Sequence, residues 1–417
     1  MNQAAEISMP TEGNVPKDDW EHVLLDSVTK RGSGHTPDKK HPEYWDGSIK
    51  WISLQDSAQL DALYIEDTAA TITIEGIKNS SAVLHQKGTV VLSRDAGVGK
   101  SAIMATDMAV SQHFMAWTCG QRLDNHFLYY WLQSKKPEFE RIANGNTIKT
   151  IGLPYFKELT IPLPPLEEQK HIASALSGID TLISSLDQLI AKKRDIQQTT
   201  MQQLLTGQIR LPGFRGEWNV KPMRALGNTY GGLAGKTKID FGHGEARYIP
   251  FMNVMTDTVI DANWLEPVDV APDEAQNLAK KGDLFFNGSS ETPEEVGFCS
   301  VLLDEIPNLY LNSFCFGFRF NTAARVNGLF FAYWFRSKAG RAAMSVLAQG
   351  ATRYNIAKSA FMQLEIPQPL EEEQTAISTV LSDMDAELAA LETRRDKARQ
   401  IKQGMMQELL TGRIRLK

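Results

Sequence analysis

The sequence predicts an α+β protein. Two halves, each with a mixed β-sheet and small helices, are related by a pseudo-twofold axis and separated by an antiparallel coiled coil of two long helices. The first observation behind this is a repeat: residues 161–211 return at 366–416, displaced by 205 positions without a gap, and 24 of 51 positions are identical. The second is coiled-coil spacing of apolar residues in both copies. The third is a region of about 150 residues before each copy, large enough to bury its own core.

The composition and the first residues exclude several classes of protein. Residues 1–17 are polar and lack the apolar core of a signal peptide, so we expect a flexible tail there. No run of about 18 apolar residues is present for a membrane span. The three cysteines lack C-x-x-C spacing, so neither a disulfide framework nor a zinc site is predicted, and a reducing cytoplasm is the expected location.

The first variable region, residues 18–160, contains short strand-like segments followed by an aromatic helix. Residues 50–56 (KWISLQD) and 87–95 (KGTVVLSRD) are expected to be short strands, the second after a glycine turn. Residues 127–136 (FLYYWLQSKK) are expected to form a helix that ends in basic residues.

Residues 161–211 form the first copy of the repeat and are expected to be one long spacer helix. Prolines favour an extended start, and Glu167 and Glu168 then suit the positive end of a helix dipole. Gly207 is expected to end the helix. Apolar residues in steps of three and four define the seam: Ile172, Leu176, Ile179, Ile183, Leu186 and Ile190.

The second variable region, residues 212–365, repeats the pattern of the first. The duplicated unit is therefore the whole half-chain, and not the helix alone. The parallel segments are 247–253 (RYIPFMN) with 50–56, 281–289 (KGDLFFNGS) with 87–95, 329–338 (LFFAYWFRSK) with 127–136, and 350–356 (GATRYNI) with 145–151 (GNTIKTI).

Residues 366–417 form the second long helix, ending at Gly412. A helix of about 40 residues rises roughly 60 Å, and one apolar stripe of that length needs a partner, for which the other copy is the obvious candidate. The connections favour an antiparallel pair with the variable regions at opposite ends. Taken alone, such a pair also fits a spacer between two unrelated modules. Its seam contains Ile377, Leu381, Met384, Leu388 and Leu391.

The net charge of −6 averages over segments of different sign. Residues 306–364 hold seven basic residues and no acidic one, while residues 100–157 hold seven basic and four acidic residues. Basic stretches of this kind are typical of phosphate binding. The alternative is a solvated face whose acidic partners come from elsewhere in the fold.

No catalytic, nucleotide-binding or metal motif is complete. AGVGKS at residues 96–101 lacks the first glycine of a P-loop, because Arg94 occupies that place. A glycine turn between two strands, with Arg94 and Lys100 projecting from it, is the favoured interpretation. The histidines have no ligand spacing. The sequence therefore predicts no catalytic residue, no cofactor and no metal in this chain.

The order of variable region, proline-and-EEQ helix, second variable region and second such helix resembles the specificity subunit of type I restriction-modification systems. The resemblance covers nearly the whole chain beyond the polar tail. Its most specific elements are IPLPPLEEQ with LLTGQIRL, and IPQPLEEEQ with LLTGRIRL. The second copy departs from the first at Leu370, where the first has Pro165.

The resemblance implies two target-recognition domains, residues 18–160 and 212–365, each reading one half of an interrupted double-stranded DNA target. It also implies two modification subunits, which transfer a methyl group from S-adenosylmethionine to adenine, and restriction or translocase subunits that use ATP and Mg. The specificity subunit itself is not the catalyst. Two alternatives stay open: a two-headed coiled-coil adaptor for partners other than nucleic acid, and an enzyme acting alone, against which the broken P-loop spacing argues.

Base readout needs donors and acceptors held over the major groove, and Arg, Lys, Asn and Gln serve best. We predict that matching loops of the two halves contact DNA; for each residue, the alternative is a phosphate contact or simple surface exposure. The predicted residues are Thr147, Lys149, Thr352, Arg353, Tyr354 and Asn355 on the paired loops, Arg94, Lys100 and Asn287 on the strand-turn loops, and Arg319 in the basic stretch.

The paired helices are expected to act as a molecular ruler. A rise of about 3.4 Å per base pair sets an upper bound of roughly 17 base pairs between the domain centres. Contacts with the modification subunits are expected on the outward faces of the helices and near the LLTG ends, because the seam itself is occupied.

Overall fold

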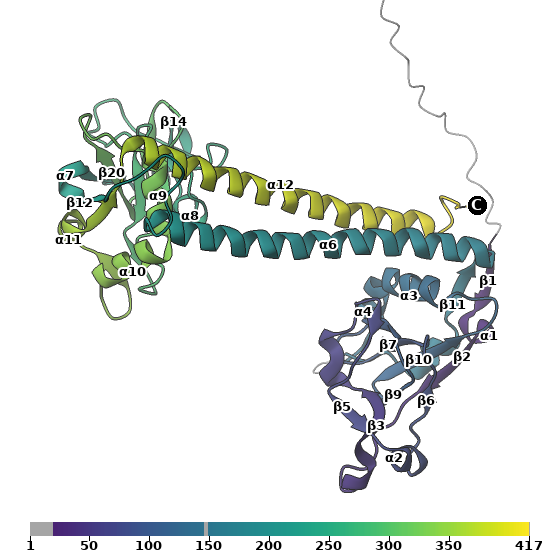
Figure 1. Ribbon diagram of the computed structural model, residues 1–417. Helices are drawn as coiled ribbons and strands as arrows, with labels where there is room; N and C mark the ends of the chain where they lie inside the picture. Colours follow the sequence, from purple (N-terminus) through teal and green to yellow (C-terminus); the bar gives the residue numbers. More distant parts are fainter. Residues whose placement is uncertain (1–19, 146–148, 417) are drawn as a thin grey trace, which may run out of the picture. The chain divides into compact units, whose positions relative to one another are not determined.

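The structure is a computed structural model that describes residues 20–145 and 149–416. The chain divides into two compact units (Figure 1). Unit 1 comprises the chain up to Asp187 together with Thr393–Lys417, and unit 2 comprises Gln188–Glu392. Each long helix is therefore divided, because its two halves belong to different units. The predicted tail, residues 1–17, lies outside the described residues.

Unit 1 contains, in its described residues, a two-stranded, a five-stranded and a four-stranded sheet. The first pairs β1 (Glu21–Leu24) with β11 (Thr160–Leu163). The second has the order β2 (Thr29–Ser33), β10 (Phe114–Cys119), β7 (Val90–Ser93), β8 (Ser101–Met104), β4 (Tyr64–Ile65). The third has the order β5 (Ala70–Ile72), β3 (Trp45–Ile52), β9 (Met108–Val110), β6 (Leu84–His85). The helical elements are α1 (Leu25–Val28), η1 (Pro42–Tyr44), η2 (Leu54–Ala58), α2 (Ile74–Lys78), α3 (Asn125–Ser134), α4 (Lys136–Ile142), α5 (Leu153–Lys157), the first half of α6 (Leu166–Leu205) and the second half of α12 (Glu371–Leu409).

Unit 2 repeats this plan. A two-stranded sheet pairs β12 (Asn219–Pro222) with β23 (Glu365–Gln368), and a four-stranded sheet has the order β13 (Gly227–Gly231), β20 (Cys315–Phe320), β16 (Leu284–Asn287), β18 (Cys299–Val301). Two three-stranded sheets have the orders β15 (Glu266–Val268), β14 (Phe241–Ile249), β19 (Leu309–Leu311), and β17 (Ser289–Ser290), β22 (Tyr354–Ile356), β21 (Ala348–Gln349). The helical elements are the second half of α6, α7 (Met223–Leu226), η3 (Lys238–Asp240), α8 (Phe251–Thr256), α9 (Gly328–Arg336), α10 (Lys338–Leu347), α11 (Lys358–Gln363) and the first half of α12 (Glu371–Leu409).

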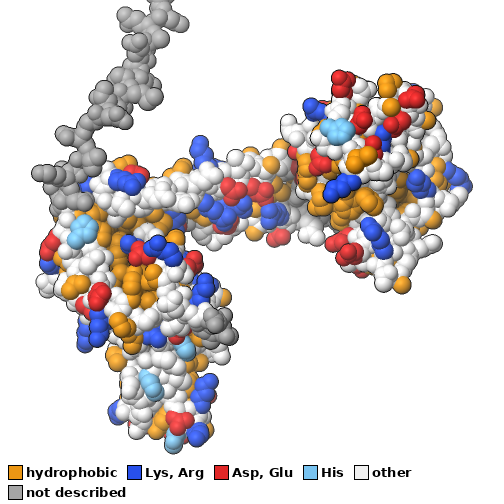
Figure 2. Space-filling model, turned by 180° about the vertical axis from the view of Figure 1, so that it is seen from behind, with side chains coloured by type: hydrophobic (Ala, Val, Ile, Leu, Met, Phe, Trp, Pro, Cys, Tyr) orange, Lys and Arg blue, Asp and Glu red, His pale blue; other side chains and the backbone are white. Residues whose placement is uncertain are grey.

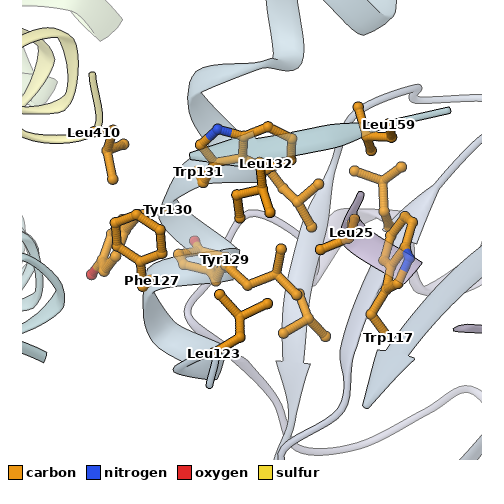
Figure 3. Close-up of a cluster of buried hydrophobic side chains, with 14 of the residues drawn as sticks. Leu25, Trp117, Leu123, Phe127, Tyr129, Tyr130, Trp131, Leu132, Leu159 and Leu410 are labelled. Carbon is orange, nitrogen blue, oxygen red and sulfur yellow. The ribbon is translucent and has the colours of Figure 1, made fainter. Parts of the chain in front are cut away.

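The main core of unit 1 forms around the aromatic helix α3. Asp124 caps this helix by accepting hydrogen bonds from the N–H groups of His126 and Phe127, which fixes where it begins. Figure 3 shows Leu410, from the end of α12, facing Phe127 and Tyr130 of α3, and all three side chains belong to one buried cluster. The core of unit 1 therefore needs residues from near both ends of the described chain.

The main core of unit 2 forms in the same way around α9. Asn327 caps α9 and accepts from the N–H of Leu329. Leu204 and Leu205, from the end of α6, are buried in the cluster that contains the phenylalanines of α9. The predicted aromatic helices are thus confirmed, each packed against the end of a long helix.

Within each unit the two half-helices run antiparallel and side by side (Figure 1). In unit 1, the start of α6, at Ile172 and Leu176, shares a cluster with the end of α12. In unit 2, the end of α6 shares a cluster with the start of α12, at Ile377 and Leu381. All of the predicted seam residues, Ile179 included, are buried or half-buried. The predicted α+β class and the antiparallel helix pairing are confirmed.

Ion pairs flank the seam in both units. Asp180 pairs with Lys402 at 2.6 Å in unit 1, and Lys193 pairs with Glu387 at 2.7 Å in unit 2. These side chains are a quarter to a half exposed, so each pair contributes at most about 1 kcal/mol and acts mainly on register.

The repeated EEQ motif holds each long helix to its own unit. The amide of Gln169 donates to the Pro164 carbonyl and accepts from the N–H of Asp124, which joins the start of α6 to the start of α3. Gln374 repeats both bonds, to Pro369 and Asn327. A glutamine at this place in both copies therefore has a structural reason.

The glutamate before that glutamine closes a second contact in both units. In unit 1, Glu168 accepts two hydrogen bonds from Arg415, each at 2.7 Å, and the Arg415 guanidinium lies 5.2 Å from the centre of the Trp20 ring. In unit 2, Glu373 accepts from Arg210, which lies 5.4 Å from the Trp218 ring. We call each set a clamp.

The predicted helix ends are found, whereas one pair of predicted strands is shorter than expected. Gly207 and Gly412 have φ of 72° and 75°, the left-handed conformation predicted for glycines that end helices. Residues 50–56 and 247–253 are strands only up to Ile52 and Ile249, so the predicted strands are wrong in their second halves. After Ile52 a 3-10 turn begins, because Ser53 caps it.

Among the described residues, no helix combines the length and the apolar character that crossing a membrane requires.

Candidate nucleic-acid interface

Three loops of unit 1 meet at the end of strand β7. The N–H of Arg94 donates to the carbonyl of His113 at 3.0 Å, and the N–H of Ile151 donates to the carbonyl of Arg94 at 3.0 Å. The turn between β7 and β8 contains Gly97 and Gly99, with φ of 104° and 85°, where other residues would be strained. AGVGKS is therefore a turn between antiparallel strands, as predicted, and not a strand-to-helix phosphate loop.

We call the place where these three loops meet the junction of unit 1. A line of charged groups runs through it. The Asp95 carboxylate lies 3.5 Å from the Nε of Arg94 and 2.6 Å from the Nδ1 of His113. The Asp95 side chain is 9% exposed and that of His113 is 33% exposed. Because the carboxylate only accepts, Nδ1 of His113 carries the hydrogen, and Nε2, which lies 3.4 Å from the amide nitrogen of Gln112, is the accepting atom of the ring.

Lysines gather beside the same turn. Lys100, Lys136 and Lys149 line a cleft of about 490 Å³ together with Gly97 and Glu140. The turn between β7 and β8 and the loop that precedes Ile151 therefore bring together three predicted residues, Arg94, Lys100 and Lys149.

The cations at this turn differ in how far they are engaged within the protein. The Nζ of Lys100 donates to the Ser57 carbonyl at 3.0 Å, and that of Lys136 lies 2.5 Å from Asp61. Lys149 is exposed. The predicted residue Thr147 lies outside the described residues.

Unit 2 contains the same junction with other side chains. The N–H of Gly288 donates to the carbonyl of Phe314 at 3.0 Å, and the N–H of Ile356 donates to the carbonyl of Gly288 at 3.1 Å. Gly288 thus takes the place of Arg94, and Phe314 takes the place of His113. The two units therefore share these backbone hydrogen bonds and differ in the side chains at the junction.

The predicted residues of the second paired loop lie beside Phe314. Thr352, Arg353 and Asn355 are exposed, and Tyr354 is half-buried in strand β22. The Arg353 guanidinium lies 6.0 Å from the centre of the Phe314 ring, and Phe314 is 60% exposed. An exposed cation beside an exposed aromatic ring can approach both a phosphate and a base.

Asn287 lies in the interior and is not exposed. Its amide nitrogen donates to the Glu295 carbonyl at 3.0 Å, and its oxygen accepts from the N–H of Phe298 at 2.6 Å. The side chain is therefore used in fixing the loop after β16, so the prediction that Asn287 contacts DNA loses its physical basis.

Arg319 also serves the fold. It forms two hydrogen bonds with Asp283, at 2.8 and 2.6 Å, and stacks over the Tyr230 ring at 5.1 Å. The Asp283 side chain is only 2% exposed, and its hydrogen bonds raise the pKa of Arg319 further. Arg319 lies on strand β20 and is not brought together with the paired loop.

The basic stretch at 306–364 is less of a surface feature than its charge count indicated. Arg336 and Arg341 both stack on the Phe298 ring and donate to backbone carbonyls, among them those of Cys299 and Val296. Burial lowers the pKa of Arg341 to about 10. In the view of Figure 2, lysine and arginine side chains are scattered among acidic ones on both units. Structural arginines thus account for part of the excess.

Four side chains at the junctions were missed by the sequence reasoning: the exposed Gln55 and Gln112 and the half-buried His113 in unit 1, and the exposed Phe314 in unit 2. The first three line a cleft of about 390 Å³ with Thr36, whose hydroxyl donates to Gln112 at 2.6 Å. The only sequence signal was the parallel between residues 50–56 and 247–253, since the loops after these strands carry Gln55 and its counterpart.

A metal centre has no support in the described part of the chain, since residues 20–145 and 149–416 contain no group of three or more His, Cys, Asp or Glu side chains placed to hold an ion. The junctions are thus surfaces of donors, acceptors and apolar groups, suited to recognition.

Comparison with known proteins places these features in a family context. Residues 17–192 and 277–402 match the family model described as type I restriction modification DNA specificity domain. The specificity subunit of the type I restriction enzyme MjaIX of Methanocaldococcus jannaschii is 32% identical over 175 residues, which cover 42% of this chain and 40% of that protein. The MjaVIII specificity subunit of the same organism is 25% identical, and the match covers 97% of this chain and 94% of that protein.

Among solved structures, the S subunit of a type I restriction-modification system from M. genitalium has the same fold. The TM-score is 0.56 with 16% identity, and the match covers 96% of this chain and 99% of that chain. At this identity the likeness concerns the fold alone.

Proposed function

We propose, from the fact that this chain belongs to the type I restriction modification DNA specificity family, that it is the subunit that recognises the DNA sequence in a type I restriction-modification complex. Residues 18–160 and 212–365 are the two target-recognition domains. Each reads one half of an interrupted double-stranded target. The chain itself is not the catalyst.

One observation carries this proposal: two junctions have the same backbone bonds and different side chains. Arg94 and His113 in unit 1 have the same backbone connections as Gly288 and Phe314 in unit 2. Two copies of one reader with different surfaces suit two different half-sites. An adaptor for a symmetric protein partner would need the same surface on both copies.

The helix pair, residues 161–211 and 366–417, is proposed to set the length of the unread spacer between the half-sites. Inserting one helical turn of about four residues after Gln203, within α6, should lengthen the spacer and leave both half-sites unchanged. The same insertion after Gly213, in an exposed loop, is the control and should change nothing. A spacer of unchanged length in the first variant would contradict the ruler.

The proposed partners follow from the same role. Two modification subunits dock on the outward faces of α6 and α12 and near the LLTG ends, and they carry S-adenosylmethionine. Restriction or translocase subunits carry ATP and Mg, while this chain carries no cofactor. The complex acts on chromosomal DNA in the cytoplasm.

Adenine methylation provides the test. Sequencing that detects methylated adenine should find one bipartite motif in cells that hold this gene with its modification partner, and the motif should vanish when the gene is deleted. Two results together would refute the role and favour the adaptor. The first is a methylation pattern that does not change on deletion, and the second is a reconstituted complex that does not bind DNA or binds it with an affinity that does not depend on salt.

A further inference from the structure

The loops after two parallel strand pairs occupy equivalent places in the two units. In unit 1, Ile52 of β3 lies beside Val110 of β9, and in unit 2, Ile249 of β14 lies beside Leu311 of β19. Because the paired strands are parallel, the loops that follow them leave the same edge of the sheet. Each unit therefore presents two neighbouring loops at one edge.

Backbone hydrogen bonds align these loops residue by residue. The N–H of Asp56 donates to the Ser53 carbonyl at 3.0 Å, and that of Asn253 donates to the Pro250 carbonyl at 3.2 Å. Met252 therefore takes the place of Gln55.

The second loop aligns in the same way. The N–H of Ser111 donates to the Ile52 carbonyl at 2.9 Å, and that of Asn312 donates to the Ile249 carbonyl at 3.2 Å. Two residues further on, Phe314 therefore takes the place of His113, in agreement with the junction bonds.

The side chains at these places differ in chemistry between the units. Unit 1 presents hydrogen-bonding groups, the amide of Gln55 and the His113 ring. Unit 2 presents apolar groups, since Met252 is 53% exposed and Phe314 is 60% exposed. Two large apolar side chains are therefore exposed on neighbouring loops at this edge of the sheet of unit 2.

The backbone of Phe314 is held in place although its ring is exposed. Its N–H donates to the Asn312 side-chain oxygen at 3.0 Å, and the Asn312 amide nitrogen donates to the Ile249 carbonyl at 3.0 Å. Asn312 is 6% exposed, so this bond network is shielded from water. The Arg353 guanidinium, 6.0 Å from the ring, places a positive charge beside it. An exposed apolar ring on a fixed backbone, next to a cation, fits the major groove near a phosphate.

We propose that Phe314 and Met252 are specificity-determining residues that contact the C5 methyl group of a thymine in the half-site read by unit 2. This inference rests on the proposed function. The thymine methyl is the one apolar mark that a base pair presents in the major groove, and phenylalanine is a residue suited to contact it. At the same places in unit 1, Gln55 and His113 read base edges through hydrogen bonds.

Two other roles for an exposed phenylalanine make different predictions. A wedge inserted between base pairs would kink the duplex and would not depend on a methyl group. A docking residue for a protein partner would affect assembly of the complex and not the choice of base. The rigid turn and the neighbouring cation favour the groove contact, and the experiment separates all three.

The test uses the full chain in complex with its modification subunits and a duplex that carries the methylated motif. Each thymine in the half-site read by unit 2 is replaced in turn by deoxyuridine, which lacks only the methyl group. Loss of one buried methyl group corresponds to about a fourfold weaker Kd. We expect that loss at one position for the wild type, no such loss for F314S, and retention of the loss for F314L.

Several results would overturn the inference. These are no thymine in that half-site, no effect of deoxyuridine at any position, or an equal effect in the wild type and F314S. A loss of affinity in F314S with reduced DNA bending and no methyl dependence would assign a wedge, and failed assembly of the F314S complex would assign a protein contact. Failure of the proposed function is distinct, because the wild type would then bind no specific duplex at all.

Discussion

Replacing Glu168 by Gln should destabilise the protein, although the change removes only one charge. The Glu168 side chain is 5% exposed and accepts two hydrogen bonds from Arg415 at 2.7 Å and one from the Trp20 indole at 3.4 Å. An amide at this place presents an N–H₂ group to the guanidinium in place of an acceptor. Removing one partner of a buried ion pair costs about 3–5 kcal/mol. Since Arg415 is 18% exposed and can regain some water, we expect the lower end, about 3 kcal/mol.

The neighbouring residue provides a matched control. Glu167 is 74% exposed and pairs with Lys170 at 2.7 Å, an arrangement worth about 0.5 kcal/mol or less. Thermal unfolding of both variants compares them directly. For a unit of this size about 3 kcal/mol corresponds to a fall in Tm of about 6–12 °C for E168Q, and E167Q should stay within about 2 °C of the wild type.

The pH dependence should identify the carboxylate as the cause. The pKa of Glu168 is lowered in the folded protein, chiefly because Arg415 donates hydrogen bonds to it. A lowered pKa stabilises the fold above the unfolded value of about 4.3, and this contribution is lost as the pH falls through the folded value. The difference in unfolding free energy between wild type and E168Q should therefore be full at pH 7 and shrink below pH 4. Equal melting of E168Q and E167Q at pH 7 would refute the clamp.

Four further substitutions separate stability from recognition. Arg319→Ala leaves the buried Asp283 carboxylate unpaired and should cost about 3 kcal/mol in urea unfolding, with the methylated motif unchanged; a changed motif at normal stability would contradict this. Arg353→Ala should weaken or relax one half-site only, and an equal loss for all DNA sequences would reassign Arg353 to phosphate binding. Leu205→Ala should cost about 2–5 kcal/mol in unfolding free energy, and Ile196→Ala, at a 43% exposed site of α6, about 0.5 kcal/mol or less.

The sequence predicted well those features that depend on regular spacing along the chain. The seam positions at Ile172 and Leu176, and the helix end at Gly207, follow from local periodicity and backbone conformation, and all are found. Glu168 was predicted only as a group at a helix start. Its partner Arg415 lies 247 positions away, and no local pattern links the two.

The junction residues show why the site was harder to predict than the helices. Asn287 has a side chain suited to reading bases, but the loop after β16 needs that amide for its own N–H and carbonyl groups. Phe314 stands in an apolar run that is typical of a core strand, and its exposure arises because Asn312 turns the chain immediately before β20. In both cases the outcome depends on hydrogen bonds that residue type alone does not indicate, since Asn287 bonds backbone groups 8 and 11 positions away and Asn312 bonds the N–H of Phe314 two positions away.

Because the chain contains two copies of one fold, each copy tests the role of residues in the other. Where both copies keep the same side chain and the same contact, as at Glu168 and Glu373 in the clamps, the residue holds the frame. Where both copies keep the backbone bond and change the side chain, as at His113 and Phe314, the backbone frame requires neither side chain. Substitution of a residue that both copies keep should therefore lower the stability and leave the methylated motif unchanged. Substitution of a residue that differs between the copies should change the sequence of one half-site and leave the stability unchanged.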